Sequence, residues 1–333
     1  MAATFAVLGA GTWGTVMAAH LQGMGHSVTL WHYRQEFAES LAASRRHPHL
    51  EGFALPGEID ISSDLQQAIS GADIVVIAVP SQEVRGVMSE ASGWIQSARV
   101  ANLSKGIENS SLKRVSEVVA EATDLPPGKI ASIYGPSHAE EVMRQVPTTL
   151  VATSSDLAYA RELQKLFSTQ HLRVYANEDI VGVELGGSVK NVIAIAAGIC
   201  VGLGFGDNTL AALTTRGLAE ITRLGVAMGA EAATFSGLSG IGDLTVTSYS
   251  RHSRNRRLGV EIGRGYSYRE VLTDMGMVAE GVATARSVLG LADKLQVDLP
   301  ICREVHQVLF EDKDPRQAIT ELMSRDLKDE TLA

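Results

Sequence analysis

The amino-acid sequence predicts an α/β protein with an N-terminal Rossmann-type doubly wound sheet followed by an all-α C-terminal domain. Up to Asn177, short apolar runs rich in β-branched residues alternate with helical patterns, which is typical of a mostly parallel sheet. From Glu178 onward the apolar residues recur at helical spacing and almost no strand signal remains. The 333 residues also exceed what one hydrophobic core usually serves. We therefore expect two domains, residues 1–177 and 178–333.

Within residues 1–177, apolar β-branched runs predict strands at Thr4–Leu8, 28–31, 73–79, 99–103, Ile130–Tyr134 and 149–152. The run 73–79 is apolar on both faces, as expected of a strand inside a parallel sheet. Helical spacing occurs at 16–24, where Gly25 ends the helix, and at 82–91, 112–122 and Leu157–Phe167. In the second domain the helical patterns cover 183–199, 210–228, 268–273, 284–295, 301–310 and 315–324.

The composition is that of a soluble globular protein and limits the ligands that we expect it to bind. Hydrophobic residues make up 45% and charged residues 20% of the chain, as in ordinary soluble globular proteins. A net charge of −9 argues against nucleic-acid binding, so any phosphate site must be built locally from Arg, Lys and helix N-termini. Cys200 and Cys302 have no CxxC spacing, and we expect reduced packing cysteines in a cytoplasmic protein without a metal site. The N-terminus lacks a signal-peptide pattern, and the apolar stretch 192–205 is shorter than the ~20 residues of a membrane span, so we expect no integral membrane segment.

A glycine-rich string, Gly9-Ala10-Gly11-Thr12-Trp13-Gly14, follows the first expected strand and opens the first expected helix. In that context GxGxxG is a dinucleotide-binding fingerprint. Gly9 permits the tight turn, Gly11 lets a pyrophosphate approach the backbone at the helix N-terminus, and Gly14 lets helix and strand pack closely. A simple glycine turn is the alternative. The string predicts that the first domain binds NAD(H) or NADP(H).

The end of the second expected strand, Leu30-Trp31-His32-Tyr33-Arg34, bears on the choice of dinucleotide. NAD-specific folds usually place Asp or Glu here to bind the ribose 2′-hydroxyl, but the first carboxylate in this chain is Glu36. Arg34 is suited to pairing with a 2′-phosphate and to stacking on adenine, which favours NADP or dual use. An ordinary exposed arginine is the alternative.

Two further segments follow expected strands, where ligands collect in open α/β sheets. Lys105 lies in Leu103-Ser104-Lys105-Gly106, and Gly106 permits close approach of a ligand. The segment Gly135-Pro136-Ser137-His138-Ala139 joins a strand to a helix, and Ser137 is expected to cap that helix while offering its hydroxyl to a substrate. For Lys105 alone, a solvated loop lysine is the alternative.

Lys190 is the most informative single residue, because its predicted helix is apolar nearly all round. A charged side chain in such a helix is costly unless it has a function. Gly186, Gly187 and Ala194 lie about one turn away and are expected to leave an open patch beside the lysine. An ammonium beside a recess could donate a proton to a carbonyl as hydride arrives. The alternative is a lysine whose stem is buried and whose ammonium reaches water.

A dense basic cluster, Arg251-His252-Ser253-Arg254-Asn255-Arg256-Arg257, follows the glycine-rich segment Gly240-Ile241-Gly242-Asp243-Leu244. The interleaved Ser and Asn add hydroxyl and amide donors to the charged groups, which favours a phosphate-binding surface. Asp243 follows a glycine turn and could orient a lysine or a substrate hydroxyl. A solvated run of charge is the alternative.

These residues, taken in order, resemble the bacterial NAD(P)-dependent glycerol-3-phosphate dehydrogenases over nearly the whole chain. The matching motifs are GAGTWG at Gly9, SKG around Lys105, GPSHAEE at Gly135, ELGGSVKNVIAIAAG at Glu184, GLGFGDN at Gly202, TRGLAE at Thr215, LSGIGDLTVT at Leu238, HSRNRRLG at His252 and MVAEGVAT at Met277. Departures are small: Thr12 stands where the family often has serine, and Val201 stands where we expect an acidic residue.

The resemblance implies roles for individual residues. It implies that residues 1–177 bind the dinucleotide and residues 178–333 bind the substrate, with Lys190 as the proton donor and acceptor. It implies that dihydroxyacetone phosphate or glycerol 3-phosphate is bound by Lys105, Gly135, Ser137, Asp243, Ser253, Arg254 and Asn255. It implies that NAD(H) or NADP(H) is bound by Gly9, Gly11, Thr12, Trp13, Gly14, Tyr33, Arg34, Lys105, Ala139, Arg254, Val278 and Glu280. It also implies a homodimer that supplies phospholipid synthesis.

Two other functions remain open on the residues alone. One is a dehydrogenase of the same two-domain plan that acts on a β-hydroxyacid or an imine, since nothing beyond the basic cluster selects phosphate over carboxylate. The other is a dinucleotide-sensing regulatory protein without turnover. The position of Lys190 argues against a sensor, because a sensor needs no proton donor.

Overall fold

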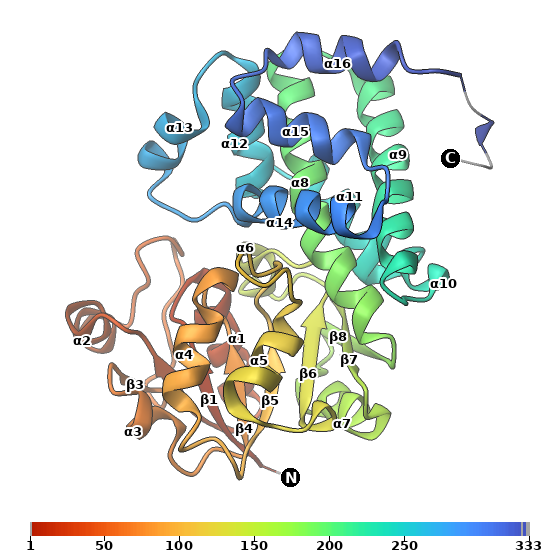
Figure 1. Cartoon of the computed structure of the whole chain (residues 1–333). Coiled ribbons are helices and arrows are strands. Elements are labelled where there is room, and N and C mark those ends of the chain that lie inside the picture. Colours follow the sequence, from red (N-terminus) through yellow and green to blue (C-terminus); the bar gives the residue numbers. More distant parts are fainter. Residues whose placement is uncertain (1, 328, 331–333) are drawn as a thin grey trace. The chain divides into compact units, whose positions relative to one another are not determined.

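The computed structural model describes residues 2–327, 329 and 330. The chain folds as two compact units. The first comprises the residues up to Lys105 together with Arg114–Ile180, and the second comprises Gly106–Lys113 together with the residues from Val181 onward (Figure 1). The excursion at 106–113, in which the chain leaves the first unit and returns to it, has no counterpart in the sequence pattern.

The first unit is built on an eight-stranded sheet with the order β3-β2-β1-β4-β5-β6-β7-β8. All neighbouring strands are parallel except β6 and β7, so the prediction of a mostly parallel, doubly wound sheet is confirmed. The strands are β1 (Thr4–Leu8), β2 (Ser27–Trp31), β3 (Asp60–Ser62), β4 (Ile74–Ile77), β5 (Arg99–Asn102), β6 (Ile130–Tyr134), β7 (Thr148–Ser154) and β8 (Leu172–Asn177).

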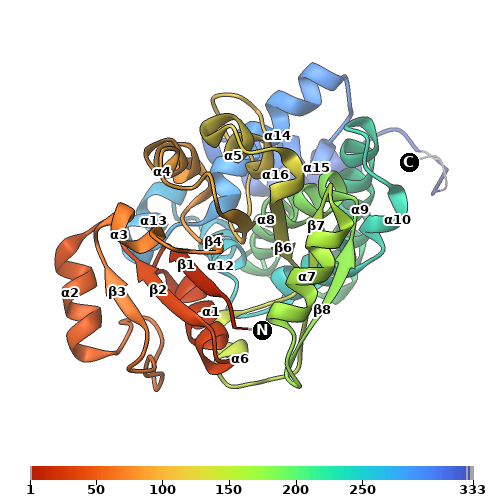
Figure 2. The same ribbon diagram turned by 90° about the horizontal axis from the view of Figure 1, so that it is seen from below.

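Helices cover both faces of this sheet (Figure 2). Along β4, Ile74 and Val76 join the core beneath α1, α6 and α7, while Val75 and Ile77 join the core beneath α3, α4 and α5. This alternation is why the strand is apolar at every position. The helices of the first unit are α1 (Thr12–Gly23), α2 (Gln35–Ser44), α3 (Leu65–Ile69), α4 (Val84–Ala91), α5 (Val115–Thr123), α6 (Ala139–Val142) and α7 (Leu157–Phe167).

One expected boundary in the first unit was wrong, and four elements were not predicted: the helices α2 and α3 and the strands β3 and β8. The helix expected from residue 112 begins only at Val115, because Leu112 has φ +59° and Arg114 is the N-cap residue, whose backbone N–H donates to the Glu117 carboxylate at 2.9 Å. The strand β3 is too short to show a period. The strand β8 does alternate, with Leu172 and Val174 buried and Arg173 and Tyr175 exposed, and this signal was missed.

The second unit is mainly helical, and α8 (Ile180–Gly202) runs through its centre (Figure 1). Nineteen of its 23 residues are buried, so its nearly uniform apolar character belongs to a core helix. By length and composition α8 is the one helix among the described residues that could cross a membrane, yet 89% of its most apolar window is buried in the protein. It is longer at both ends than the expected helix 183–199.

The remaining elements of this unit surround α8 and share one hydrophobic core with it. The helices α10, α11 and α12 were not predicted. The elements are α9 (Asp207–Ala227), α10 (Ala232–Phe235), a π-helical turn at Leu238–Gly242, α11 (Asp243–Tyr249), α12 (Arg254–Gly263), α13 (Tyr268–Met275), α14 (Glu280–Leu295), α15 (Pro300–Phe310) and α16 (Pro315–Met323).

Two pairs of glycines bring the backbones of α8 and α12 into contact. A Cβ at Gly198 would overlap the Arg256 carbonyl and lie 2.9 Å from Gly259 Cα, and a Cβ at Gly259 would overlap the Ile195 carbonyl. Gly202 and Gly263 repeat the arrangement one turn further along. Because no side chain separates the two helices, the N-terminus of α12 is fixed relative to the middle of α8.

Candidate active site

The turn between β1 and α1 has the shape that an anion-binding glycine turn requires. Gly9 has φ +117°, and a Cβ there would lie 2.6 Å from the Ala78 carbonyl oxygen. A Cβ at Gly14 would overlap the Gly9 carbonyl, whereas Gly11 is exposed and has nothing within 4 Å of a Cβ. Gly11 caps α1 with extended backbone and no side-chain hydrogen bond. The first-turn amides of α1, with the helix dipole behind them, therefore fit a dinucleotide pyrophosphate.

Tyr33 and Arg34 lie at the carboxyl end of β2, next to this turn in the sheet. Both are exposed, and the Arg34 guanidinium stands 5.1 Å from the centre of the Tyr33 ring. The pair offers a cation and an aromatic face at the strand end where an adenosine ribose would lie.

Lys105, Gly135 and Ser137 are brought together at the carboxyl ends of β5 and β6. The Lys105 ammonium donates a hydrogen bond of 3.1 Å to the Gly135 carbonyl and lies 5.5 Å from the centre of the Tyr134 ring. The Ser137 hydroxyl donates to the same carbonyl at 3.1 Å. The expectation that Ser137 caps a helix was wrong, because α6 begins at Ala139 after His138 and has no side-chain cap.

The second unit holds a buried ion pair at the centre of the molecule's most apolar helix. The Lys190 ammonium, on α8, donates to Asp243 Oδ1 on α11, and their side chains are only 6% and 1% exposed. It also donates to the Thr247 hydroxyl at 2.6 Å. Asp243 and Thr247 are one turn apart on α11, so both face the lysine. The arrangement keeps a protonated amine in one place inside a poorly hydrated environment.

The expected open patch around Lys190 was wrong at Gly186. A Cβ at Gly186 would lie 2.5 Å from the Ser239 carbonyl oxygen, so the missing side chain admits backbone and not a ligand. The π-helical turn Leu238–Gly242 uses that space, and Asp243 follows it directly. The glycine therefore matters because it lets the turn approach α8 and bring Asp243 to Lys190.

The N-terminus of α12 places the predicted substrate residues in three different environments. Arg254 is exposed, whereas Ser253 and Asn255 are buried. The Ser253 hydroxyl oxygen caps α12 by accepting the Arg256 N–H at 3.2 Å. Asn255 donates to Asn191 Oδ1 at 2.9 Å and accepts the Gly281 N–H at 2.9 Å. Asn255 thus ties α12 to α8, one residue from Lys190, and to the start of α14.

Val278 and Glu280 lie where the chain enters α14. Val278 is 49% exposed, and Glu280 is the first residue of the helix. Val278 lines an open hollow of about 540 Å³ in the second unit. The lining residues are Asn109, Leu272, Gly276, Met277, Val278, Ala279, Val282, Ala283 and Arg286.

Comparison with known proteins places the chain in a family. Residues 4–160 match the sequence model of the NAD-dependent glycerol-3-phosphate dehydrogenase N-terminus, and residues 179–320 match that of the C-terminus. The chain belongs to the NAD(P)-dependent glycerol-3-phosphate dehydrogenase family. It is therefore an oxidoreductase of this family, and the resemblance stated from its motifs is confirmed.

Relatives of known name agree over the full length. The chain is 53% identical over 330 residues to glycerol-3-phosphate dehydrogenase [NAD(P)+] of Pelodictyon phaeoclathratiforme, covering 98% of each chain. It is 51% identical over 327 residues to that of Prosthecochloris aestuarii, covering 97% of this chain and 98% of the relative. The crystal structure of glycerol-3-phosphate dehydrogenase from Coxiella burnetii superimposes with a TM-score of 0.94 at 37% identity, covering 97% of this chain and 99% of that one.

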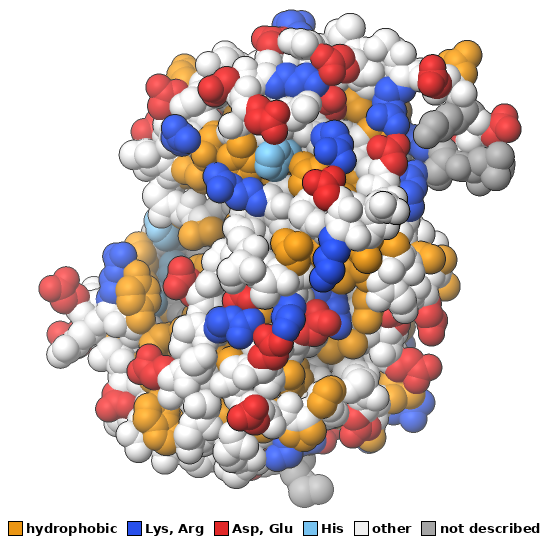
Figure 3. Space-filling model, in the orientation of Figure 1, with side chains coloured by type: hydrophobic (Ala, Val, Ile, Leu, Met, Phe, Trp, Pro, Cys, Tyr) orange, Lys and Arg blue, Asp and Glu red, His pale blue; other side chains and the backbone are white. Residues whose placement is uncertain are grey.

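Charge on the visible surface is mixed. In Figure 3 the Lys and Arg side chains lie among Asp and Glu and do not form one continuous positive field. This agrees with a net charge of −9 and with phosphate recognition by a few local groups. Among the described residues, no group of three or more His, Cys, Asp or Glu could hold a metal ion.

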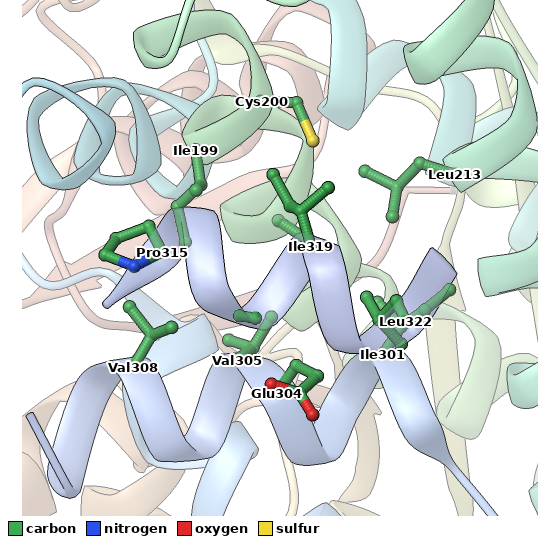
Figure 4. A pocket seen from close by; sticks show the side chains of 12 residues that line it. Ile199, Cys200, Leu213, Ile301, Glu304, Val305, Val308, Pro315, Ile319 and Leu322 are labelled. Carbon is green, nitrogen blue, oxygen red and sulfur yellow. The ribbon is translucent and has the colours of Figure 1, made fainter. Parts of the chain in front are cut away.

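A second cavity in the helical unit belongs to packing and not to the reaction. It measures about 40 Å³ and lies beneath α16, where Cys200 and Ile319 approach each other (Figure 4). Burial raises the pKa of the Cys200 thiol to about 11, so the thiol is protonated and unreactive. Glu304 is the charged residue of its lining, and its carboxylate pairs with Lys313 at 2.5 Å.

Three residues that the structure brings to the site were not predicted from sequence. Thr247 holds the Lys190 ammonium, and Asn191 and Gly281 hold Asn255. A signal existed for Thr247, which stands four residues after Asp243 and so shares its helix face. A signal also existed for Asn191, which, like Lys190, is a polar residue in an apolar helix.

Proposed function

We propose that this protein reduces dihydroxyacetone phosphate to sn-glycerol 3-phosphate with NAD(P)H, reversibly. The observation that carries the proposal is the buried Lys190–Asp243 pair with Thr247, in a chain of this family. The named relatives at 51% and 53% identity support the substrate and the reaction.

In the proposed mechanism Lys190 is the acid and base of the reaction. Bound NAD(P)H supplies the hydride that the ketone carbon accepts. Lys190 Nζ gives a proton to the ketone oxygen, and Asp243 and Thr247 hold the ammonium so that one of its N–H bonds faces that oxygen. Lys105 adds positive charge where the alkoxide develops. In the oxidation direction the amine takes the proton back.

Substrate binding is proposed to fall to Lys105, Gly135, Ser137, Asp243, Ser253, Arg254 and Asn255. Exposed Arg254 at the start of α12 supplies the cation for the substrate phosphate, and Asn255 supplies an amide whose orientation two hydrogen bonds already fix. A group fixed before the substrate arrives loses little entropy on binding, which favours correct placement of the ketone.

The dinucleotide is proposed to bind through Gly9, Gly11, Thr12, Trp13, Gly14, Tyr33, Arg34, Lys105, Ala139, Arg254, Val278 and Glu280. The first-turn amides of α1 hold the pyrophosphate, and the exposed Arg34–Tyr33 pair meets the adenosine end. The absence of a carboxylate at the end of β2 favours NADP or dual use.

We also propose a function for each domain and a cellular location for the protein. Residues 1–177 form the dinucleotide-binding domain and residues 178–333 the substrate and catalytic domain. The resemblance to the bacterial enzymes supports a cytoplasmic homodimer that supplies phospholipid synthesis.

The alternative hypothesis is that the protein is a dehydrogenase that acts on a β-hydroxyacid or an imine. A PanE/ApbA family ketopantoate reductase from Ralstonia eutropha shares the fold with a TM-score of 0.61 at 17% identity, which speaks for fold alone. The test is a substrate panel with the purified protein and NADPH or NADH, followed by absorbance at 340 nm. Oxidation with dihydroxyacetone phosphate and not with ketopantoate or a cyclic imine supports the proposal. Turnover of only the carboxylate-bearing compounds or the imine contradicts it.

A further inference from the structure

A buried histidine, His47, contacts the glycine turn between β1 and α1, although it lies in none of the sequence motifs described above. His47 lies in the loop after α2 and is 6% exposed. Its Nε2 stands 3.1 Å from the carbonyl oxygen of Ala10, which lies between Gly9 and Gly11 in the turn. The contact joins residues 37 positions apart, so the distant loop is tied to the point where the pyrophosphate is expected to bind.

The hydrogen bonds of the ring determine its tautomer. The backbone N–H of His49 donates to His47 Nδ1 at 3.1 Å, so Nδ1 carries a lone pair. The proton of the neutral ring is then on Nε2, which donates to Ala10. Burial is the main cause that lowers the pKa of His47 to about 4; the contact with the Ala10 carbonyl opposes it, and nearby His49 and His32 add smaller lowering effects. The ring is therefore neutral at physiological pH. The donor to Ala10 is therefore a fixed feature of the folded unit.

Planarity of the peptide bond links this contact to the amide of Gly11. The Ala10 carbonyl and the Gly11 N–H belong to one rigid plane and point in opposite directions. A donor that holds the carbonyl on the His47 side consequently aims the Gly11 N–H away from His47. Gly11 is exposed, has no side chain and has open space around it, so glycine's own conformational freedom leaves this plane free to rotate without an outside contact.

Several contacts hold the loop that carries His47, and one holds its ring. Pro48 restricts His47 to extended backbone. Arg45, in the left-handed conformation at the end of α2, donates from its guanidinium to the Ile59 carbonyl at 2.7 Å. Leu50 N–H donates to the His47 carbonyl at 3.1 Å, and the Phe37 ring meets the imidazole edge-on at 5.8 Å.

We propose that His47 is a positioning residue for dinucleotide binding: through the Ala10 carbonyl it orients the Gly11 amide toward the cofactor pyrophosphate. The inference rests on the proposed function, since it assumes that the turn binds a dinucleotide. His47 does not touch the substrate in this account, so its effect belongs to cofactor affinity and not to the chemical step.

The test compares His47→Leu, which keeps bulk but removes the donor, with His47→Gln, whose amide N–H can replace Nε2–H. The probes are NADPH, ADP-ribose, which retains the pyrophosphate, and adenosine 2′-monophosphate, which lacks it. Dissociation constants are measured by calorimetry with the full chain. His26→Leu is the matched control: His26 is also buried and bonded through its ring to backbone, at Ala3, but that residue lies at the opposite end of β1.

We expect His47→Leu to raise the dissociation constants of NADPH and ADP-ribose about tenfold, the effect of one lost hydrogen bond. Binding of adenosine 2′-monophosphate should stay within about twofold of wild type, and so should kcat at saturating NADPH. His47→Gln should recover most of the affinity, and His26→Leu should lower the melting temperature without changing these ratios.

Other outcomes overturn the inference. If adenosine 2′-monophosphate loses as much affinity as ADP-ribose, His47 serves the adenosine pocket or the fold. If His47→Leu binds all three probes as wild type does, the contact does not position the turn. A wild-type protein that binds no dinucleotide contradicts the proposed function, which is a separate result from a His47 variant that behaves like wild type.

Discussion

The Lys190–Asp243 pair allows catalysis and folding to be separated by mutation. Lys190→Met removes the proposed proton donor, so kcat should fall by at least about 10²-fold, the lower range for loss of a general acid. The same change leaves the Asp243 carboxylate, 1% exposed, without the ammonium that pairs with it. Breaking one side of a buried ion pair costs about 3–5 kcal/mol of stability. For a unit of this size that is a fall in melting temperature of roughly 6–20 °C.

The double variant Lys190→Met/Asp243→Asn separates the two effects. Neither position is then charged, so most of the lost stability should return, because the desolvated carboxylate is gone. Activity should not return, because no ammonium is present. Asp243→Asn alone should be unstable in the same way as Lys190→Met, since it leaves the other charge behind.

The assay is a pair of measurements on each protein: melting temperature by calorimetry and kcat with dihydroxyacetone phosphate at saturating NADPH. A near-normal kcat in Lys190→Met would show that Lys190 is not the proton donor. A double variant that regains activity together with stability would show that Lys190 serves only the fold.

Three further predictions test other parts of the account. Arg34→Ala should weaken NADPH by about tenfold to a hundredfold, the 1.5–3 kcal/mol of a charge-assisted contact to the 2′-phosphate, and NADH much less; equal losses in titrations of both would assign Arg34 to adenine stacking. Arg254→Ala should lower kcat/KM steeply for dihydroxyacetone phosphate but hardly for dihydroxyacetone, and added phosphite should restore the rate on dihydroxyacetone much less than in wild type; equal slowing of both substrates would remove Arg254 as the phosphate anchor. Burial raises the pKa of Glu220 to about 7 against opposing backbone N–H donors at Ile301 and Cys302, so the folded state favours the protonated carboxyl. That contribution, at most about 3 kcal/mol, is complete below about pH 4.5, the ordinary pKa of a glutamate, and is lost as the pH rises through 7. The melting temperature of wild type should therefore fall more between pH 5 and 8 than that of Glu220→Gln, and identical pH profiles would contradict this.

The elements that are easiest to predict from sequence are those that are buried on every side. The strand β4 is covered on both faces and is apolar throughout, and α8 is buried almost all round, so neither depends on distant residues for its pattern. The helix α12 was missed because only two of its buried residues, Leu258 and Ile262, are large and apolar, and the others are Asn255 and Gly259. Glycine contributes nothing to a hydrophobic period, although here it lets the backbones of α8 and α12 come into contact.

The site was predictable one residue at a time but not as an arrangement. Lys190 stood out because a charge in an apolar helix needs a reason, and Asp243 was expected to orient a lysine or a hydroxyl. That the two pair across 53 positions depends on Gly186 admitting the π-helical turn, which no local pattern reveals. The contact of His47 could not be predicted, because its partner is a backbone carbonyl, which every residue has regardless of its side chain.

The most direct measurement is the absorbance at 340 nm of NADPH mixed with dihydroxyacetone phosphate, started by adding either the wild-type protein or the Lys190→Met/Asp243→Asn variant. Wild type should oxidise NADPH in step with formation of sn-glycerol 3-phosphate, detected by a stereospecific coupled assay. The double variant, at a similar melting temperature, should be slower by at least about 10²-fold. No oxidation by wild type, or equal rates from both proteins, would contradict the claim that this chain reduces the ketone at Lys190.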